Sequence, residues 1–188
     1  MRLLTEQHYC SICCYNEDIF PTWVLKPFKS FEVHLMQREE DNMLEMRECR
    51  PEDLSGLLYL YAQLHSQMEP TINDRIIAVW EQIMRDENQH VLAGFLDGAM
   101  VSSCVINIIP NLTHDQRPYS VIENVITDTN MRSRGYASSL LSEAKEIAQK
   151  KNCYKIMLMT GSKKDSTLQF YEKAGYNRND KTGFIMWL

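Results

Sequence analysis

The sequence predicts an α/β (α+β) fold in which a mixed central sheet is flanked by helices. The prediction starts from residues 121–126, an apolar run rich in β-branched side chains that is typical of a strand buried on both faces. A polar turn follows, and residues 137–148 then carry small and apolar side chains at helical spacing. Further strand and helix patterns surround this strand–loop–helix unit, so the predicted order is β, α, α, β, β, β, α, β, α, β.

Composition limits the classes of function. A chain of 188 residues fits one domain with a short extension, and it can bury a sizeable core. A net charge of −5 argues against a broad basic surface for nucleic acid. No apolar run approaches the roughly 20 residues that cross a bilayer, and the first residues lack the apolar region of a signal peptide. We therefore expect a cytoplasmic protein with reduced cysteines that binds neither nucleic acid nor membrane.

The predicted domain covers residues 43–188, after an N-terminal extension of unknown role over residues 1–42. The extension contains four potential zinc ligands, His8, Cys10, Cys13 and Cys14. A second well-spaced pair is missing, and two adjacent cysteines cannot easily face one ion, so we expect no metal site. The more ordinary interpretation is that apolar residues of the extension pack on the domain or on a partner.

The first half of the domain carries local signals for each element. Alternating side chains over residues 44–48 predict a strand, and a proline with two acidic residues at 51–53 predicts the start of a helix. A second helix is expected from about residue 73 to 85. Residues 91–96 and 100–109 are expected to form strands, joined by Asp97-Gly98, a strong hairpin signal.

After the helix that begins near residue 137, residues 154–159 predict a short buried strand. A short helix is expected from Ser166, and Gly175 is expected to cap its end. The apolar residues 183–188 predict a last strand. This strand could pair across a homodimer, or it could lie inside the sheet.

The loop before the long helix is suited to an anion. The first N–H groups of a helix have no partner inside it and carry partial positive charge, so they can bind a phosphate. Gly135 lacks a Cβ and lets the backbone approach, while Arg132 and Arg134 add forked donors. We interpret this loop as a pyrophosphate cradle. The alternative is an ordinary β–α turn whose glycine only eases packing.

The motif Arg132-x-x-Gly135-x-Ala137 resembles the Q/R-x-x-G-x-G/A signature of the GNAT superfamily of acetyl-CoA-dependent N-acetyltransferases. Downstream, residues 170–176 read FYEKAGY and resemble the family's F-Y-x-x-x-G-F/Y element. Upstream, the resemblance includes residues 122–125. The order and spacing of these segments are the same as in the family. The resemblance covers about residues 43–188. It implies the GNAT acyl-CoA N-acyltransferase fold and a cleft beside the central strand for the pantetheine arm of acetyl-CoA, the co-substrate.

The resemblance also implies which residues hold acetyl-CoA. Along the central strand they are Val125, Ile126 and Thr127, and at the diphosphate they are Arg132, Ser133, Arg134, Gly135, Tyr136, Ala137 and Ser138. The N–H of Val125, at a bulge that the family's central strand carries, is the expected oxyanion donor. Many relatives also have an asparagine before the F-Y element, whereas residues 163–167 here contain none.

Two side chains are candidates for acid–base chemistry. Tyr171 could protonate the departing thiolate, because a phenol keeps its proton at neutral pH, although it could also be a core aromatic. Glu123 could serve as the base, directly or through a water, because a carboxylate is unusual in a strand of valines and isoleucines. Its alternative is a glutamate on the polar face of the strand, paired with a lysine.

We therefore expect an acyltransferase that moves an acetyl group from acetyl-CoA to a primary amine of a small molecule. One alternative is a protein N-acetyltransferase that modifies lysine or an N-terminal amine. Another is a non-catalytic acyl-CoA-binding module that docks a partner through residues 1–42. The presence of both Glu123 and Tyr171 argues against the module, but the sequence does not identify the acceptor amine.

Overall fold

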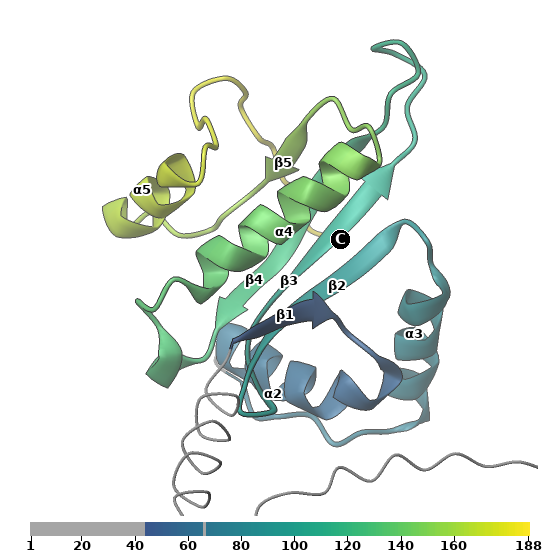
Figure 1. Ribbon diagram of the computed structural model, residues 1–188, viewed down its shortest axis with the longest axis vertical. Coiled ribbons are helices and arrows are strands. Elements are labelled where there is room, and N and C mark those ends of the chain that lie inside the picture. The colour runs from purple at the N-terminus through teal and green to yellow at the C-terminus, as the bar shows by residue number, and fades with distance from the viewer. Residues whose placement is uncertain (1–43, 66) are drawn as a thin grey trace, which may run out of the picture. The chain divides into compact units, whose positions relative to one another are not determined.

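The computed structural model describes residues 44–65 and 67–188 (Figure 1). The predicted extension, with its cysteines and His8, lies outside these residues. The elements in chain order are β1 (Glu45–Glu48), η1 (Pro51–Asp53), α2 (Leu54–Leu64), α3 (Asp74–Arg85), β2 (Gln89–Leu96), β3 (Ala99–Ile109), β4 (Tyr119–Thr127), η2 (Thr129–Met131), α4 (Tyr136–Lys150), β5 (Ile156–Leu158) and α5 (Asp165–Lys173). Among the described helices, none is long and apolar enough to cross a membrane.

The sheet is mixed, as predicted. Its strands follow the order β1-β2-β3-β4-β5, with antiparallel pairing throughout except for the parallel pair β4 and β5. Helix α2 contacts β3 and β4 and helix α3 contacts β2, whereas α4 crosses the opposite face over β2, β3 and β4. Figure 1 shows this arrangement, with the C-terminal helix α5 beyond α4. The layers agree with the α/β class that the sequence predicts.

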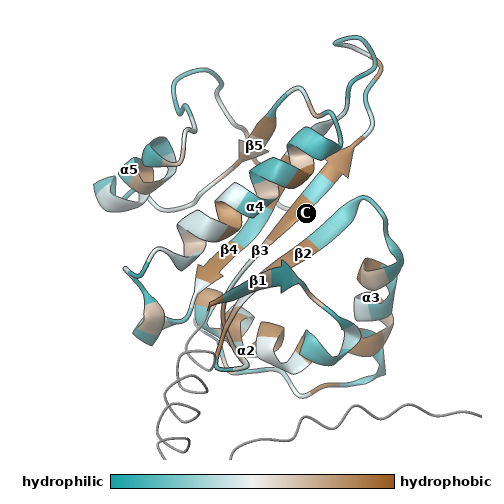
Figure 2. Ribbon diagram, in the orientation of Figure 1, coloured by the Kyte–Doolittle hydropathy of each residue, from teal (hydrophilic) through white to brown (hydrophobic). Residues whose placement is uncertain are grey.

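Two apolar clusters hold the layers together. The cluster under α4 is formed by Leu92, Cys104, Ile106, Ile108, Ile122, Leu140, Leu141, Ala144 and Ala148, and residues of α5 pack against it. The cluster under α2 and α3 is formed by Cys49, Leu57, Trp80, Val91, Ala93, Phe95 and Val105. Figure 2 shows hydrophobic stretches on β2, β3 and β4, hydrophilic and hydrophobic residues alternating along α4, and a largely hydrophilic β1. The central strands are therefore covered on both faces.

Two turn predictions are confirmed by backbone geometry. Asp97 and Gly98 both have positive φ, 51° and 75°, as the hairpin between β2 and β3 requires. Gly175 has a φ of 95° after α5, where its N–H donates to the carbonyl of Glu172 at 2.9 Å. The N–H of Tyr176 donates to the carbonyl of Tyr171 at 3.0 Å, which completes a glycine-capped helix end.

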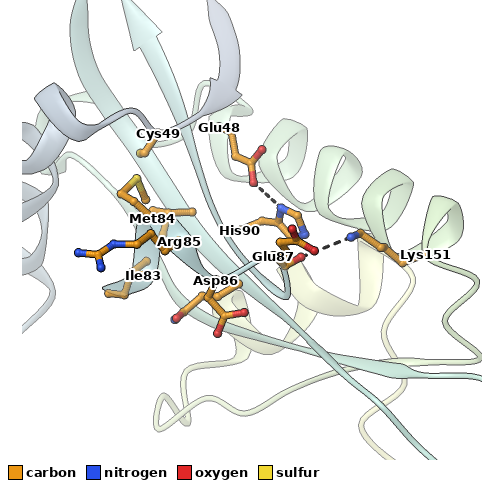
Figure 3. Close-up of a pocket in the computed structure, with 11 residues that line it drawn as sticks. Glu48, Cys49, Ile83, Met84, Arg85, Asp86, Glu87, His90 and Lys151 are labelled. Atoms are coloured by element: carbon orange, nitrogen blue, oxygen red, sulfur yellow. Dashed lines mark hydrogen bonds and ion pairs between the residues drawn. The ribbon is translucent and has the colours of Figure 1, made fainter. Parts of the chain in front are cut away.

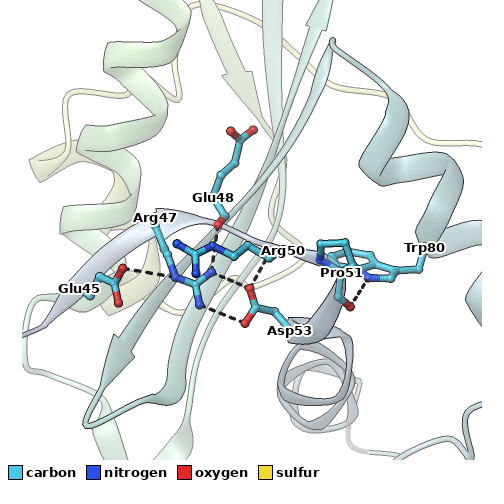
Figure 4. A network of polar contacts seen from close by, with 7 residues as sticks. All are labelled: Glu45, Arg47, Glu48, Arg50, Pro51, Asp53 and Trp80. Atoms are coloured by element: carbon cyan, nitrogen blue, oxygen red, sulfur yellow. Dashed lines mark hydrogen bonds and ion pairs between the residues drawn. The ribbon is translucent and has the colours of Figure 1, made fainter.

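An ionic contact ties β1 to the start of α2 (Figure 4). The guanidinium of Arg47 donates two hydrogen bonds to Asp53, at 2.6 and 3.1 Å, and stacks 3.8 Å from the ring centre of Phe95. The indole N–H of Trp80 donates to the carbonyl of Pro51 at 2.9 Å, which joins α3 to the same corner. The hydrogen bond with Arg47 lowers the pKa of Asp53, because it favours the charged carboxylate.

The predicted last strand is wrong. Residues 183–188 have no regular secondary structure, and Phe184 and Trp187 are 90% and 85% exposed. An apolar run becomes a strand only where another strand offers hydrogen bonds, and within the described residues none pairs with this segment. The sheet therefore has five strands in the described part of the chain, one fewer than expected.

Candidate active site

Strand β4 contains a bulge at the position where the resemblance implied one. Val105 of β3 pairs with Glu123, but Ser103, two residues earlier, pairs with Ile126. Strand β4 thus has one residue more than β3 over this interval, and Asn124 takes a left-handed conformation with φ of 54°. Asparagine tolerates this conformation better than most residues.

The bulge turns two consecutive side chains toward α2. Glu123 pairs with Val105, which belongs to the cluster under α2 and α3, so both side chains face that side of the sheet. The amide of Asn124 donates to the hydroxyl of Tyr61 of α2 at 3.4 Å. Val125 packs against the cluster under α4. The face below α2 therefore receives one carboxylate and one amide from adjacent positions.

Beyond the bulge, none of the described strands lies beside one edge of β4. The pairing of β4 with β5 covers only Ser120 to Ile122, opposite Ile156 to Leu158. The two strands then diverge, as Figure 1 shows. Glu123, Ile126 and Thr127 keep their pairing with β3 on the other edge, and Asn124 and Val125 form the bulge between them. Their free edge can accept an extended ligand with amide groups, in the way that a peptide adds to a sheet.

The free edge leads to the start of α4. Gly135 is the N-cap of this helix, with φ of 87°, and no side chain caps the helix. The first helical backbone bond runs from the N–H of Ser139 to the carbonyl of Gly135, at 3.0 Å. The N–H groups of the first turn before Ser139 are therefore available to an anion. Ser133 also has a positive φ, of 62°, which adds to the concave turn of the loop.

The geometry of Gly135 argues against a simple packing role. A Cβ at this position would meet no other atom within 4 Å, so close packing within the chain does not require glycine. The positive φ does, since other residues are strained there. Arg132 and Arg134 are both exposed beside this turn. Arg132 donates from Nε to the carbonyl of Thr127 at 3.3 Å, which ties the loop to the end of β4.

Tyr171 lies on α5, half-buried against the cluster under α4. Its ring packs edge-on against Phe170 and Tyr176, with centroid distances of 4.9 and 6.2 Å. Burial raises the pKa of Tyr171, because it disfavours the phenolate. Among the described residues, its hydroxyl has no hydrogen-bond partner. A protonated and uncommitted hydroxyl is a suitable proton donor.

Glu123 is half-buried, and no lysine of the described residues forms an ion pair with it. The alternative of a lysine-paired surface glutamate is therefore not supported within this part of the chain.

In the loop before α5, the hydroxyl of Ser162 donates to that of Thr167 at 3.1 Å. Thr167 is thus engaged within its own loop, where many relatives have an asparagine.

Two residues hold the loop between β4 and α4 without any signal for this role in the sequence. Asp128 is 7% exposed and accepts a hydrogen bond from the N–H of Asn130 at 2.8 Å. The side-chain amide of Gln63 on α2 donates to Asp128 at 2.9 Å. This hydrogen bond lowers the pKa of Asp128. No local pattern signals a contact between residues so far apart in the sequence.

A separate cavity of about 400 Å³ opens between the ends of α3 and α4 (Figure 3). Glu48, Met84 and His90 line it, and Glu48 contacts His90. Lys151, another lining residue, follows the last residue of α4, whereas the turn at Gly135 precedes the first. Because α4 has 15 residues, it is about 22 Å long, and the cavity lies at the far end from that turn. In residues 44–65 and 67–188, no three potential ligands could hold a metal ion.

A family model described as "Acetyltransferase (GNAT) family" matches residues 54–176. The matched segment contains the bulged strand, the turn at Gly135 and the helix that carries Tyr171. The chain belongs to the acetyltransferase (GNAT) family. The family resemblance of the motif around Gly135 is therefore confirmed, together with the fold it implies.

Relatives of this GNAT chain are found among curated proteins and solved structures. Glucosamine 6-phosphate N-acetyltransferase of Trypanosoma brucei brucei is 33% identical over 84 residues, which are 45% of this chain and 55% of the relative. The chain thus spans about half the length of that curated relative. A solved structure from Agrobacterium tumefaciens str. C58, named provisionally as an acetyltransferase, is 35% identical in sequence to this chain. Its TM-score is 0.73, and the match covers 77% of this chain and 99% of that chain. A Trypanosoma brucei acetyltransferase is 26% identical, with a TM-score of 0.66 over 77% and 100%.

Proposed function

We propose that this GNAT chain is an N-acetyltransferase that moves an acetyl group from acetyl-CoA to a primary amine of a small molecule. The observation that carries the proposal is the continuity between the free edge of β4 and the uncapped first turn of α4. One surface offers backbone amides in a row, and the next offers N–H groups with positive partial charge. A pantetheine arm followed by a diphosphate has the matching order of groups.

In this proposal the backbone of Val125, Ile126 and Thr127 hydrogen-bonds the amides of the pantetheine arm. The loop and first turn of α4 bind the diphosphate, through Arg132, Ser133, Arg134, Gly135, Tyr136, Ala137 and Ser138. The bulge supports the assignment of Val125 as oxyanion donor, because it interrupts the regular pairing with β3 around that residue.

The proposed acid and base approach the thioester from two sides. Glu123 faces the α2 side of the sheet, where it could take a proton from the amine, directly or through a water. Tyr171 packs on the α4 side, where its hydroxyl could protonate the departing thiolate. The divergence of β4 from β5 gives the thioester a path between these two sides.

A small-molecule amine is favoured as the acceptor because the curated relative is named for glucosamine 6-phosphate. The acceptor would meet Glu123, Asn124 and Tyr61 below α2. Fold alone does not determine the acceptor, so an amine of a protein substrate is the second candidate within the same chemistry.

The test combines binding with turnover. Isothermal titration with acetyl-CoA is expected to show one site per chain, and a thiol-release assay over a panel of primary amines is expected to find an accepted one. A panel of amino sugars and other small amines should give release, whereas peptides with lysine or a free N-terminus should not. Release only with peptides would overturn the choice of acceptor. Binding without release for any amine would favour a non-catalytic module.

A further inference from the structure

We propose that Gln63 of α2 is a positioning residue that holds the diphosphate-binding loop in place. The inference rests on the proposed function, since it assigns a role in binding acetyl-CoA to a residue outside the family motif. Gln63 lies on the last turn of α2, and its side chain reaches the loop that connects β4 to α4. Among the described residues, it forms no hydrogen bond with those that we assign to the chemical step.

Both the nitrogen and the oxygen of the Gln63 side-chain amide form hydrogen bonds with the loop. Its Nε2 donates to Oδ2 of Asp128 at 2.9 Å. Its Oε1 accepts two hydrogen bonds from Thr129, one from the backbone N–H at 3.0 Å and one from the hydroxyl at 2.9 Å. Gln63 thus binds two consecutive loop residues, because an amide supplies a donor and an acceptor together.

The contact fixes the loop where it leaves the sheet. Asp128 is buried, its N–H donates to the carbonyl of Val101 at 2.8 Å, and its Oδ1 accepts from the N–H of Asn130 at 2.8 Å. The segment that follows is a single 3-10 turn, η2, in which no residue is buried. Little apolar packing holds this turn, so its polar contacts decide its position. The turn leads directly into Arg132, the first residue of the anion-binding motif.

Loss of Gln63 would leave the buried carboxylate of Asp128 with one partner fewer and release Thr129. The loop would then sample other positions, and ordering it on binding would weaken the interaction with the diphosphate. Because lost hydrogen bonds of this kind each weaken an interaction severalfold, we expect the KM for acetyl-CoA to rise about tenfold. The value of kcat at saturation should change less than about twofold, since the reacting groups lie elsewhere.

The test compares Gln63→Leu with Gln149→Leu, the same change at an exposed position near the end of α4. Binding of acetyl-CoA and of S-acetyl-pantetheine, which lacks the diphosphate, is measured for each variant and for wild type by titration. Gln63→Leu should weaken acetyl-CoA about tenfold and leave S-acetyl-pantetheine unchanged, and Gln149→Leu should change neither. Equal weakening of both ligands, or of neither, would overturn the positioning role.

A second variant covers the case in which Gln63→Leu does not fold. Gln63→Glu keeps the acceptor for Thr129 but sets a second carboxylate against Asp128. Among the described residues, Tyr59 and Arg132 are charged or titratable neighbours of Asp128, and Glu69 is a charged neighbour of Tyr59. As pH falls from about 7.5 to 5.5, one of the two carboxyl groups should take a proton and donate in place of the amide. Affinity of this variant for acetyl-CoA should therefore recover toward wild type. A ratio of affinities that does not vary with pH would contradict the proposal.

The two hypotheses fail in different ways. If wild type binds no acetyl-CoA, the proposed function is wrong. If wild type binds acetyl-CoA and both Gln63 variants bind it equally well, only the role of Gln63 is wrong.

Discussion

Glu123 and Tyr171 lie on opposite faces of the central sheet. Glu123 pairs with Val105 and faces the cluster under α2 and α3, whereas Tyr171 packs against the cluster under α4. If Glu123 is the base for the attacking amine and Tyr171 the acid for the departing thiolate, as we propose, the thioester must pass between strands. The pairing of β4 with β5 ends at Ile122, one residue before Glu123, which is where such a passage is needed.

Tyr171→Phe tests the proton donor. Among the described residues the hydroxyl has no hydrogen-bond partner, so its removal should leave the midpoint of thermal unfolding unchanged. We expect kcat to fall about a hundredfold or more, the effect typical of a lost general acid. Since burial raises the pKa of Tyr171 above its ordinary value of 10, the wild-type hydroxyl stays protonated and kcat should not decline between about pH 7 and 9. Unchanged turnover in Tyr171→Phe would leave Tyr171 as a core aromatic only.

Glu123→Gln tests the base. The amide keeps the shape of the side chain but cannot accept a proton, so kcat/KM should fall about a hundredfold or more. Glu143→Gln, an exposed change on α4, is the control and should keep the wild-type value. A Glu123→Gln variant with the kcat/KM of wild type would remove Glu123 from the mechanism.

Arg134→Glu tests whether the loop before α4 binds the diphosphate of acetyl-CoA. Reversal of this exposed charge beside the uncapped turn of α4 should lower acetyl-CoA affinity by about tenfold or more, because charge-assisted hydrogen bonds to phosphate are among the stronger ones. Lys145→Glu makes the same change in charge on the exposed face of α4, and its affinity should stay near that of wild type. The titrations are done in low salt, because salt screens charges and the difference in affinity between the variants is then largest. Equal affinities of Arg134→Glu and wild type would mean that the diphosphate does not bind here.

The lowered pKa values of two aspartates predict how the stability of the fold depends on pH. The pKa of Asp53 is lowered by its hydrogen bond with Arg47, and that of Asp128 by its hydrogen bond with Gln63, both from an ordinary value of 3.8. A group with a lowered folded-state pKa stabilises the fold above its unfolded-state pKa, and this contribution is lost as pH falls through the folded-state pKa. The midpoint of thermal unfolding should therefore fall steeply below about pH 4.

Asp53→Asn isolates one of these two contributions. The variant should be less stable than wild type at neutral pH, and the difference between the two should shrink as pH falls from about 4 to 2. Thermal unfolding followed by circular dichroism at several pH values measures this. A difference that stays constant across the range would show that the ionisation of Asp53 does not contribute.

Local sequence signals were sufficient for most of the fold, because the strand–turn–helix pattern and the hairpin at Asp97-Gly98 depend on neighbouring residues. The position of the bulge came from the family resemblance, and the only local sign of it is an asparagine at position 124. The contact of Gln63 with Asp128 joins residues 65 positions apart, so no periodicity could have revealed it. The prediction of a strand over residues 183–188 was wrong for a related reason, because a strand needs a partner strand that the sequence does not identify.

That segment leads to a prediction about assembly. Five consecutive apolar side chains, Phe184 to Leu188, are exposed, and β5 has β4 as its only neighbour among the described strands. An apolar run without a partner and a strand with a free edge are complementary, so we expect two copies of this chain to pair through them. Light scattering after size exclusion should give the mass of a dimer.

The double variant Phe184→Ser with Trp187→Ser removes the two largest exposed side chains of this run. Each large apolar side chain contributes about 1.5–3 kcal/mol when buried, so their loss should shift the variant to a monomer at micromolar concentration. Tyr59→Ser with Met68→Ser changes two exposed side chains elsewhere and should leave the mass unchanged. A wild-type chain that is monomeric, or a dimer that survives the double change, would contradict pairing through residues 184–188.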